Sequence, residues 1–196
     1  MIETVDDLDL QVSTRPDLAA ATRAARDFLA ALGVSCDNPG MRKSPQRMAE
    51  AYAAMITARP FEMTTFPNDE RYDELVVVKS IPVQSVCEHH LLPFVGLAHV
   101  GYLPADRILG LSKFARVVEM FAHRPQVQER LTQQIARWLD DQLAPKGVGV
   151  VIEAEHMCMT LRGVRAPGTV TRTSAVFGVI RDIPESRAEF FSAVAK

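Results

Sequence analysis

The segment "ELVVVKSIPVQSVCEHHLLPFVGLAHVGYL", residues 74–103, contains two runs that are typical of β-strands. Residues 74–86 and 94–103 are rich in β-branched and aromatic side chains, which favour extended structure. Between the two runs lies Cys-Glu-His-His, residues 87–90. The segment therefore predicts two consecutive strands whose connection carries four chemically reactive side chains.

The pattern of elements continues with two helices and two more strands. Residues 110–124 and 125–143 place apolar side chains at helical spacing. Residues 147–163 and 169–181 have strand composition again. The order ββααββ predicts an α+β fold, with an antiparallel sheet and two helices on one face. Open sheet edges favour pairing with other subunits, so we expect a homo-oligomer.

The N-terminal third is helical in pattern and differs from the rest. Residues 17–33 are rich in alanine and leucine and end in glycine, and residues 44–58 begin with a Ser-Pro pair, which is typical of a helix start. Residues 59–73 have the composition of a loop. We therefore expect an N-terminal helical extension, residues 1–62, followed by a catalytic domain, residues 63–196.

Composition limits the classes of function. Of the 196 residues, 47% are hydrophobic and 23% are charged, and the net charge is −2. This balance favours neither nucleic acid nor an anionic membrane as partner, although a local basic patch can still bind a small anion. There is no apolar run of about 18 residues, and the acidic start "MIETVDDLDLQ" is unlike a signal peptide. We expect a cytoplasmic protein.

Cys87 and His90 form a C-x-x-H pair with the potential to bind a metal ion. In a strand, residues 87 and 89 share one face and His90 points to the other. Only a turn at the end of the strand brings Cys87 and His90 together. His89 would then lie beside the metal without binding it.

A second cluster lies in "AEHMCMTLRG", residues 154–163. If this segment is a strand, His156, Cys158, Thr160 and Arg162 all project from one face. Cys158 is then a candidate third ligand, and His156 a neighbouring acid or base. Two cysteines and one histidine with an open fourth position are typical of catalytic zinc, which lowers the pKa of bound water to roughly 7.

The remaining cysteine and histidines have simpler interpretations. Three cysteines do not make a disulfide framework. No histidine lies near Cys36 in the sequence, so we expect a small buried hydrophobic residue there. For His99 and His123 we expect packing or surface roles.

Polar side chains near the helix starts are candidates for binding an anionic substrate. Lys113 and Arg116 are three residues apart at the start of a helix, and together with Arg162 they could bind a triphosphate. The alternative is a solvated helix face. Gln128 and Glu129 lie in the first turn of the next helix. There Glu129 could favour the helix N-terminus, or it could accept hydrogen bonds from the N1–H and amino group of guanine.

Several motifs in this order resemble GTP cyclohydrolase I. They are SVCEHHLLPFVG, GYLP, GLSKFARVVE, RPQVQERLTQQIA and EAEHMCMTLRGV, and the resemblance covers residues 16–192. It implies a tunnelling fold and a decamer of two pentamers, with active sites between subunits. It also implies that GTP and water are converted to 7,8-dihydroneopterin triphosphate and formate, the first step of pterin and folate-type biosynthesis.

The resemblance also implies roles for the candidate residues. The implied zinc ligands are Cys87, His90 and Cys158. The implied catalytic residues are His89 and His156 for proton transfer and Ser112 near the ribose. The implied substrate-binding residues are Gln128 and Glu129 for guanine, and Lys113, Arg116, Arg162 and, from a neighbouring subunit, Arg47 for the triphosphate. Glu88 is expected to support the ligands or to lie at an interface.

Two other functions compete with this one. A relative on the same fold that acts in a 7-deazaguanine pathway would use a cysteine nucleophile and need no zinc. A non-enzymatic zinc-binding or nucleotide-binding protein would normally have four protein ligands in a closed site. The set Cys87, His90 and Cys158 argues against both. Leu97 stands where the family often has lysine. Because the N-terminal region is short, we expect that no feedback regulatory protein binds to this protein.

Overall fold

The computed structural model describes residues 16–195. The acidic first fifteen residues, which belong to the predicted helical extension, lie outside the described part, as does residue 196. The chain divides into two compact units, Met1–Thr57 and Ala58–Lys196. The predicted boundary after residue 62 stays a prediction. Within the described residues, no helix has the length and apolar character that crossing a membrane requires.

The N-terminal unit contains the two helices expected from its sequence. Helix α1 spans Leu18–Ala31, and the side chain of Asp17 accepts a hydrogen bond from the Ala20 N–H at 2.9 Å. This contact satisfies one of the backbone donors that every helix N-terminus leaves open. Helix α2 spans Ser44–Ile56 with Pro45 in its first turn, where a missing N–H does no harm.

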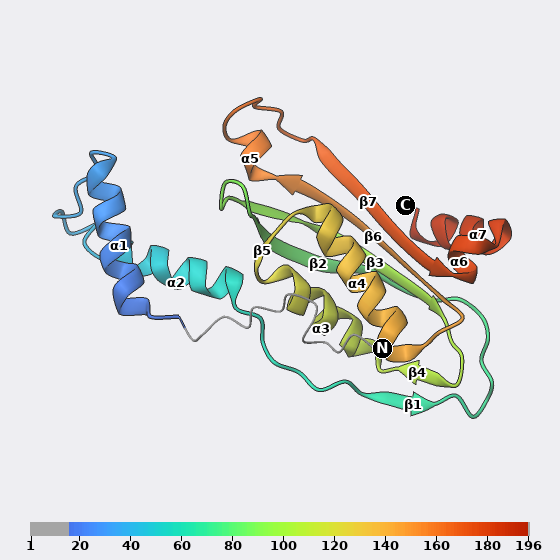
Figure 1. Ribbon diagram of the computed structural model, residues 1–196. Coiled ribbons are helices and arrows are strands. Elements are labelled where there is room, and N and C mark those ends of the chain that lie inside the picture. The colour runs from blue at the N-terminus through green and yellow to red at the C-terminus, as the bar shows by residue number, and fades with distance from the viewer. Residues whose placement is uncertain (1–15, 196) are drawn as a thin grey trace, which may run out of the picture. The chain divides into compact units, whose positions relative to one another are not determined.

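The second unit is built on a five-stranded sheet of order β5-β2-β3-β6-β7 (Figure 1). Its long strands are β2 (Val76–Cys87), β3 (Pro93–Leu103), β6 (Gly147–His156) and β7 (Val170–Gly178), and each pairs antiparallel with its neighbour. The short strand β5 (Pro125–Gln126) runs parallel to the end of β2. The antiparallel arrangement predicted for the four long strands is confirmed.

Two helices cover one face of this sheet (Figure 1). They are α3 (Leu111–Ala122) and α4 (Gln128–Leu143), and their apolar sides are fully buried. The rings of Phe114 on α3 and Tyr102 on β3 lie 5.5 Å apart between centroids. Burial of these aromatic and aliphatic side chains is the main stabilising contribution in this layer. The predicted pair of helices on one face is confirmed.

Two connecting segments differ from the prediction. Within the predicted loop 59–73, β1 (Thr65–Pro67) pairs antiparallel with β4 (Arg107–Leu109) as a separate two-stranded sheet. The predicted strand 169–181 ends at residue 178, and α6 (Val179–Asp182) follows. The β1–β4 pairing joins segments that are distant in the sequence, and β7 ends where its pairing with β6 ends. Neither feature leaves a local sequence signal.

Helix α7 (Pro184–Val194), which the sequence analysis did not predict, packs on the opposite face of the sheet. Its Phe190 is fully buried and lies against Gly101 and Gly149, which are register partners on β3 and β6. Side chains alternate along a strand. Gly101 therefore faces away from the side to which Tyr102 points, where α3 lies. The two glycines leave the space that the Phe190 ring fills.

Candidate active site

The Cys87–His90 turn has the geometry that a C-x-x-H metal site requires. Strand β2 ends at Cys87, whose carbonyl accepts hydrogen bonds from the N–H of His90 at 3.3 Å and of Leu91 at 2.8 Å. The chain reverses through Leu91, which has a positive φ of 53°. As a result, His90 Nδ1 lies 3.8 Å from Cys87 Sγ. His89 lies beside the pair, with Nδ1 at 4.0 Å from the same sulfur.

Helix α5 (Met157–Thr160) replaces the strand predicted to continue through residue 163, and that part of the prediction is wrong. Residue Phe94, next to the start of β3, pairs with His156. Residues beyond 156 therefore have no β3 partner, and their backbone groups find partners in a helical turn instead. Helix α5 therefore places Cys158 beside Cys87 and His90.

Three donor atoms meet at this point. Cys87 Sγ, Cys158 Sγ and a ring nitrogen of His90 all lie within 4.8 Å of one another. A tetrahedral zinc ion, with bonds of about 2.3 Å to sulfur and 2.0–2.1 Å to nitrogen, needs its ligand atoms roughly 3.5–4 Å apart. Burial raises the pKa of the Cys158 thiol, and the sulfur of Cys87 raises it further. A divalent cation between two such thiols removes this cost, so the residues fit zinc.

The ring of His156 is held by Phe94 and Gln128. It stacks on Phe94, with centroids 4.5 Å apart and an angle of 11° between the planes. The amide nitrogen of Gln128 donates to the carbonyl oxygens of Ile152 and Thr171, both at 3.0 Å. Since a carbonyl can only accept, Gln128 Oε1 must be the atom that lies 2.8 Å from His156 Nε2. His156 therefore carries a proton on Nε2.

The surroundings of His156 favour its neutral form. Burial lowers the pKa of His156, and the carboxylate of Glu129 partly opposes this effect. With the proton fixed on Nε2, the neutral ring presents Nδ1 as its acceptor. This is the tautomer that a general base at Nδ1 requires.

The basic candidates on α3 lie around one carboxylate. Arg116 contacts Glu119 at 3.3 Å, and Arg59 donates two hydrogen bonds to the same carboxylate at 2.6 and 2.7 Å. The guanidinium of Arg59 holds the pKa of Glu119 below its usual range. The ammonium of Lys113 lies 6.0 Å from the ring centroid of Phe61. Arg116 therefore contacts a carboxylate that Arg59, from the segment before β1, also binds, and Lys113 lies near Phe61 of the same segment.

The other predicted site residues are exposed. Ser112 lies in the first turn of α3, Glu129 in the first turn of α4, and Arg162 in the loop after α5. Arg47 lies on α2 in the N-terminal unit, and it is exposed as well. All of these side chains are open to a ligand or to another subunit.

Comparison with known proteins shows the family. The profile of GTP cyclohydrolase I matches residues 21–195. The chain belongs to the GTP cyclohydrolase I family. GTP cyclohydrolase 1 of Mycolicibacterium vanbaalenii is 50% identical over 189 residues, which cover 94% of each chain. GTP cyclohydrolase 1 of Streptococcus agalactiae is 47% identical over 185 residues, which cover 92% of this chain and 99% of the relative.

The tunnelling fold that the resemblance implied is confirmed by membership of the GTP cyclohydrolase I family, together with the ββααββ order of the long elements. A solved structure, the archaeosine synthase QueF-Like in the apo form, matches 53% of this chain and 93% of its own chain, with a TM-score of 0.45 and 20% identity.

Two charged residues near the site were missed by the sequence analysis. Glu119 contacts Arg59 across 60 positions of sequence, and Arg130 contacts Glu88 across 42. Neither spacing has a motif. Arg116 and Glu119 do give a local signal of an ion pair, because residues three apart on a helix lie on the same side.

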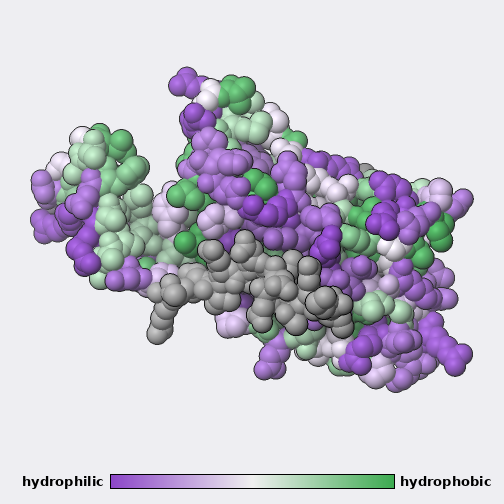
Figure 2. All heavy atoms as spheres, viewed as in Figure 1, coloured by the Kyte–Doolittle hydropathy of each residue, from purple (hydrophilic) through white to green (hydrophobic). Residues whose placement is uncertain are grey.

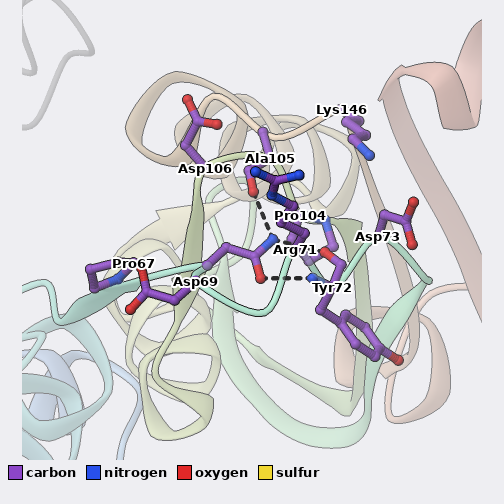
Figure 3. A pocket seen from close by; sticks show the side chains of 10 residues that line it. Pro67, Asp69, Arg71, Tyr72, Asp73, Pro104, Ala105, Asp106 and Lys146 are labelled. Atoms are coloured by element: carbon purple, nitrogen blue, oxygen red, sulfur yellow. Dashed lines mark hydrogen bonds between the residues drawn. The ribbon is translucent and has the colours of Figure 1, made fainter.

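A hollow lies between the segments around β1 and β4 (Figure 3). Its volume is about 670 Å³, and it is lined by the segments that flank β1 and β4 and by Lys146. The side chain of Asn68 connects the two segments that line the hollow. It accepts a hydrogen bond from the Tyr72 N–H and donates to the carbonyl oxygens of Tyr72 and Ala105. None of the predicted site residues lines this hollow.

Proposed function

We propose that the protein is a zinc-dependent GTP cyclohydrolase I, which converts GTP and water to 7,8-dihydroneopterin triphosphate and formate. One observation carries this proposal: in a chain of this family, Cys87, His90 and Cys158 converge on one point with no fourth protein ligand among the described residues. Such a donor set is typical of a catalytic zinc site rather than a structural one.

Cys87, His90 and Cys158 would bind the zinc ion. When bound, zinc lowers the pKa of water towards 7 and so supplies a nucleophile near neutral pH, which ring opening at C8 of the purine requires. The two sulfur ligands come from buried cysteines. Two thiolate ligands favour zinc over magnesium or calcium, because the latter two metals prefer oxygen ligands.

His156 and His89 would transfer protons. His156 Nδ1 accepts a proton at the reacting imidazole ring, because Gln128 fixes the other proton on Nε2. His89 lies next to Cys87 with 64% of its side chain exposed, so it can exchange protons with solvent. Opening of the ring, loss of formate, rearrangement of the ribose and closure of the pterin ring all need such transfers.

Glu129 would bind guanine, with its carboxylate accepting from the N1–H and the 2-amino group. Gln128 was predicted to assist there. Its side chain also makes four hydrogen bonds inside the protein, to Ile152, Thr171, Thr173 and His156. We therefore assign Gln128 a second task, the orientation of His156. Ser112 at the start of α3 would contact the ribose.

Lys113, Arg116 and Arg162 would bind the triphosphate, with Arg47 supplied by a neighbouring subunit. Glu119 contacts Arg116 and would keep its guanidinium in place before substrate binds. The start of α3 also presents backbone N–H groups, which favour an anion. The net charge of −2 does not oppose this, because the cations are concentrated locally.

The proposed assembly is a homodecamer of two pentamers with active sites between subunits, working in the cytoplasm. The exposed side chains of Ser112, Glu129 and Arg162 support a site that a second subunit completes. The three free cysteines fit a reducing compartment. Light scattering on the purified protein would test the assembly, and a monomer that turns over GTP would contradict it.

Variants of the two groups of residues test this proposal. We expect Cys87→Ser, His90→Ala and Cys158→Ser to lose both zinc and formate release. We expect His89→Ala and His156→Ala to keep one zinc per protomer and to lose turnover by about 10²–10⁴-fold, the usual contribution of a general acid or base.

Zinc content by mass spectrometry and formate release from GTP, measured on the same samples, provide the check. Loss of zinc from the His89 or His156 variant would contradict the ligand assignment. Full formate release by zinc-free wild-type protein would contradict the zinc dependence. No formate release by the zinc-loaded wild type would favour the alternative, a 7-deazaguanine-pathway enzyme with a cysteine nucleophile.

A further inference from the structure

Glu88 stands inside the C-E-H-H motif, yet the proposed mechanism gives it no step. It lies between Cys87 and His89 at the end of β2. About a third of its side chain is exposed. Its role therefore has to come from the groups that its side chain contacts.

The carboxylate of Glu88 accepts a hydrogen bond from Arg130 on α4. The same guanidinium donates through Nε to Gln126 Oε1 at 2.9 Å. Gln126 is only 1% exposed, and its amide nitrogen donates to the Phe121 carbonyl at 3.0 Å and to Gln134 at 2.8 Å. Arg130 is thus held by a buried and fully bonded amide. We call Glu88, Gln126 and Arg130 the Arg130 clamp.

A main-chain bond runs beside the Arg130 clamp. The Glu88 N–H donates to the Gln126 carbonyl at 3.0 Å, and Cys87 is the register partner of Gln126 in the parallel pair of β2 and β5. The metal-binding turn is therefore joined to β5 through both backbone and side chains. Since β5 leads directly into α4, the turn is also joined to the start of that helix.

The Arg130 clamp connects the metal-binding turn with the start of α4. At one end, the second oxygen of Glu88 lies 3.7 Å from His89 Nε2. At the other end, Arg130 follows Gln128 and Glu129 in the first turn of α4. A shift of either end would change the spacing between the metal ligands and the groups that hold His156 and guanine.

We propose that Glu88 and Arg130 are positioning residues, which fix the Cys87–His90 turn at one distance from the start of α4. Their effect on metal binding stands by itself, and their effect on turnover rests on the proposed function. An isolated surface ion pair contributes little. The Arg130 clamp differs because its guanidinium is oriented by a buried glutamine and its carboxylate belongs to the residue that directly follows the metal ligand Cys87.

The test compares Arg130→Met, Arg130→Lys, Glu88→Gln and the double variant Glu88→Gln/Arg130→Met with the full-length wild type. Zinc affinity is measured by competition with a chromogenic chelator, and kcat and KM for GTP are measured at saturating zinc. Arg137→Met is the matched control, because Arg137 is an exposed arginine on the same helix.

We expect each single variant to weaken zinc binding about 10–100-fold, the usual effect of losing a group that supports a metal ligand. At saturating zinc, kcat should fall while KM stays within about twofold. The double variant should be no worse than Arg130→Met, because the two residues act as one unit. Arg130→Lys should not rescue the loss, since an ammonium cannot span both partners.

Several results would overturn the proposal. They are zinc affinity and kcat within twofold of Arg137→Met, losses that multiply in the double variant, or full rescue by lysine. If Arg130→Met fails to fold, Glu88→Gln at a partly exposed position still decides the question. If the wild type releases no formate from GTP, the proposed function fails, and zinc affinity alone judges the Arg130 clamp.

Discussion

At the scale of single residues, Gln128 connects the catalytic histidine to the interior of the sheet. Gln128 is only 1% exposed, and both polar atoms of its side-chain amide have partners. Buried polar groups with all partners present orient each other strongly, and removal of one leaves the others without a partner. The orientation of His156 therefore depends on a residue that the sequence suggested only for substrate binding.

We predict that Gln128→Met keeps zinc but lowers kcat about 10–100-fold. Methionine fills a similar volume, but His156 Nε2 and two carbonyl groups lose their partner, so the ring is no longer fixed. Zinc content and kcat of the variant, compared with the exposed Gln133→Met on the same helix, provide the check. A kcat equal to that of the control would contradict the orienting role.

Residue spacing predicted those parts of the site that depend on residues close together in the sequence. C-x-x-H placed Cys87 and His90 correctly once a turn was assumed, because three-residue spacing converges in any tight turn. Cys158 was found for the wrong reason, since a helical turn rather than a strand brings it to the other ligands. The contacts of Glu119 with Arg59 and of Arg130 with Glu88 could not be found, because these partners are distant in the sequence.

At the scale of elements, α7 shows what periodicity alone cannot predict. The helix has few apolar residues in a regular pattern, so the segment gave no clear helical signal. Its stability in the fold comes from a small cluster with Phe190, Val194, Ile180 and Val151 at the centre. Strands β2 and β3 and helices α3 and α4, by contrast, have patterns that match their burial, and they were predicted within a few residues. The strand predicted over 147–163 ends at His156 instead.

We predict that Phe190→Ala lowers the free energy of unfolding by about 3–5 kcal/mol, because a fully buried ring leaves a cavity beside Gly101 and Gly149. Phe191→Ala, at a partly buried position on the same helix, should cost less. Chemical denaturation of both variants tests the difference. Equal losses would show that the two glycines do not form a specific seat for Phe190.

The contact between Arg59 and α3 gives a pH-dependent contribution to stability. A carboxyl whose pKa is lowered in the folded state stabilises the fold above its unfolded pKa, about 4.3 for glutamate, and this effect is lost as the pH falls through the folded-state pKa. The pKa of Glu119 is lowered, chiefly by its hydrogen bonds to Arg59.

We therefore predict that Glu119→Gln lowers the free energy of unfolding at pH 7 by about 1 kcal/mol or less, because Arg59 is largely exposed. The difference from wild type should shrink towards zero below about pH 4. Unfolding curves of both proteins at pH 7 and in acid provide the check. A difference that is the same at both pH values would exclude the ion pair as its cause.

At the scale of the whole molecule, exposed apolar side chains and an open strand edge indicate where a second copy could bind. Strand β7 lies at the edge of the sheet, and exposed apolar residues occur at its first position, Val170, and at Leu161 and Val164 in the loop before it. Figure 2 shows apolar atoms on the part that protrudes there. These features agree with a site completed by another subunit, which the sequence of one chain could only suggest.

The measurement that tests the central claim most directly is incubation of the purified protein with GTP, following formate and the dihydropterin chromophore together. A sample treated with a chelator and a sample reloaded with zinc accompany it. We predict that both products form in equal amounts, disappear with chelation and return with zinc. Formation of both products at an undiminished rate in the zinc-free sample, or of neither in the zinc-loaded one, would contradict the claim that Cys87, His90 and Cys158 form the catalytic centre.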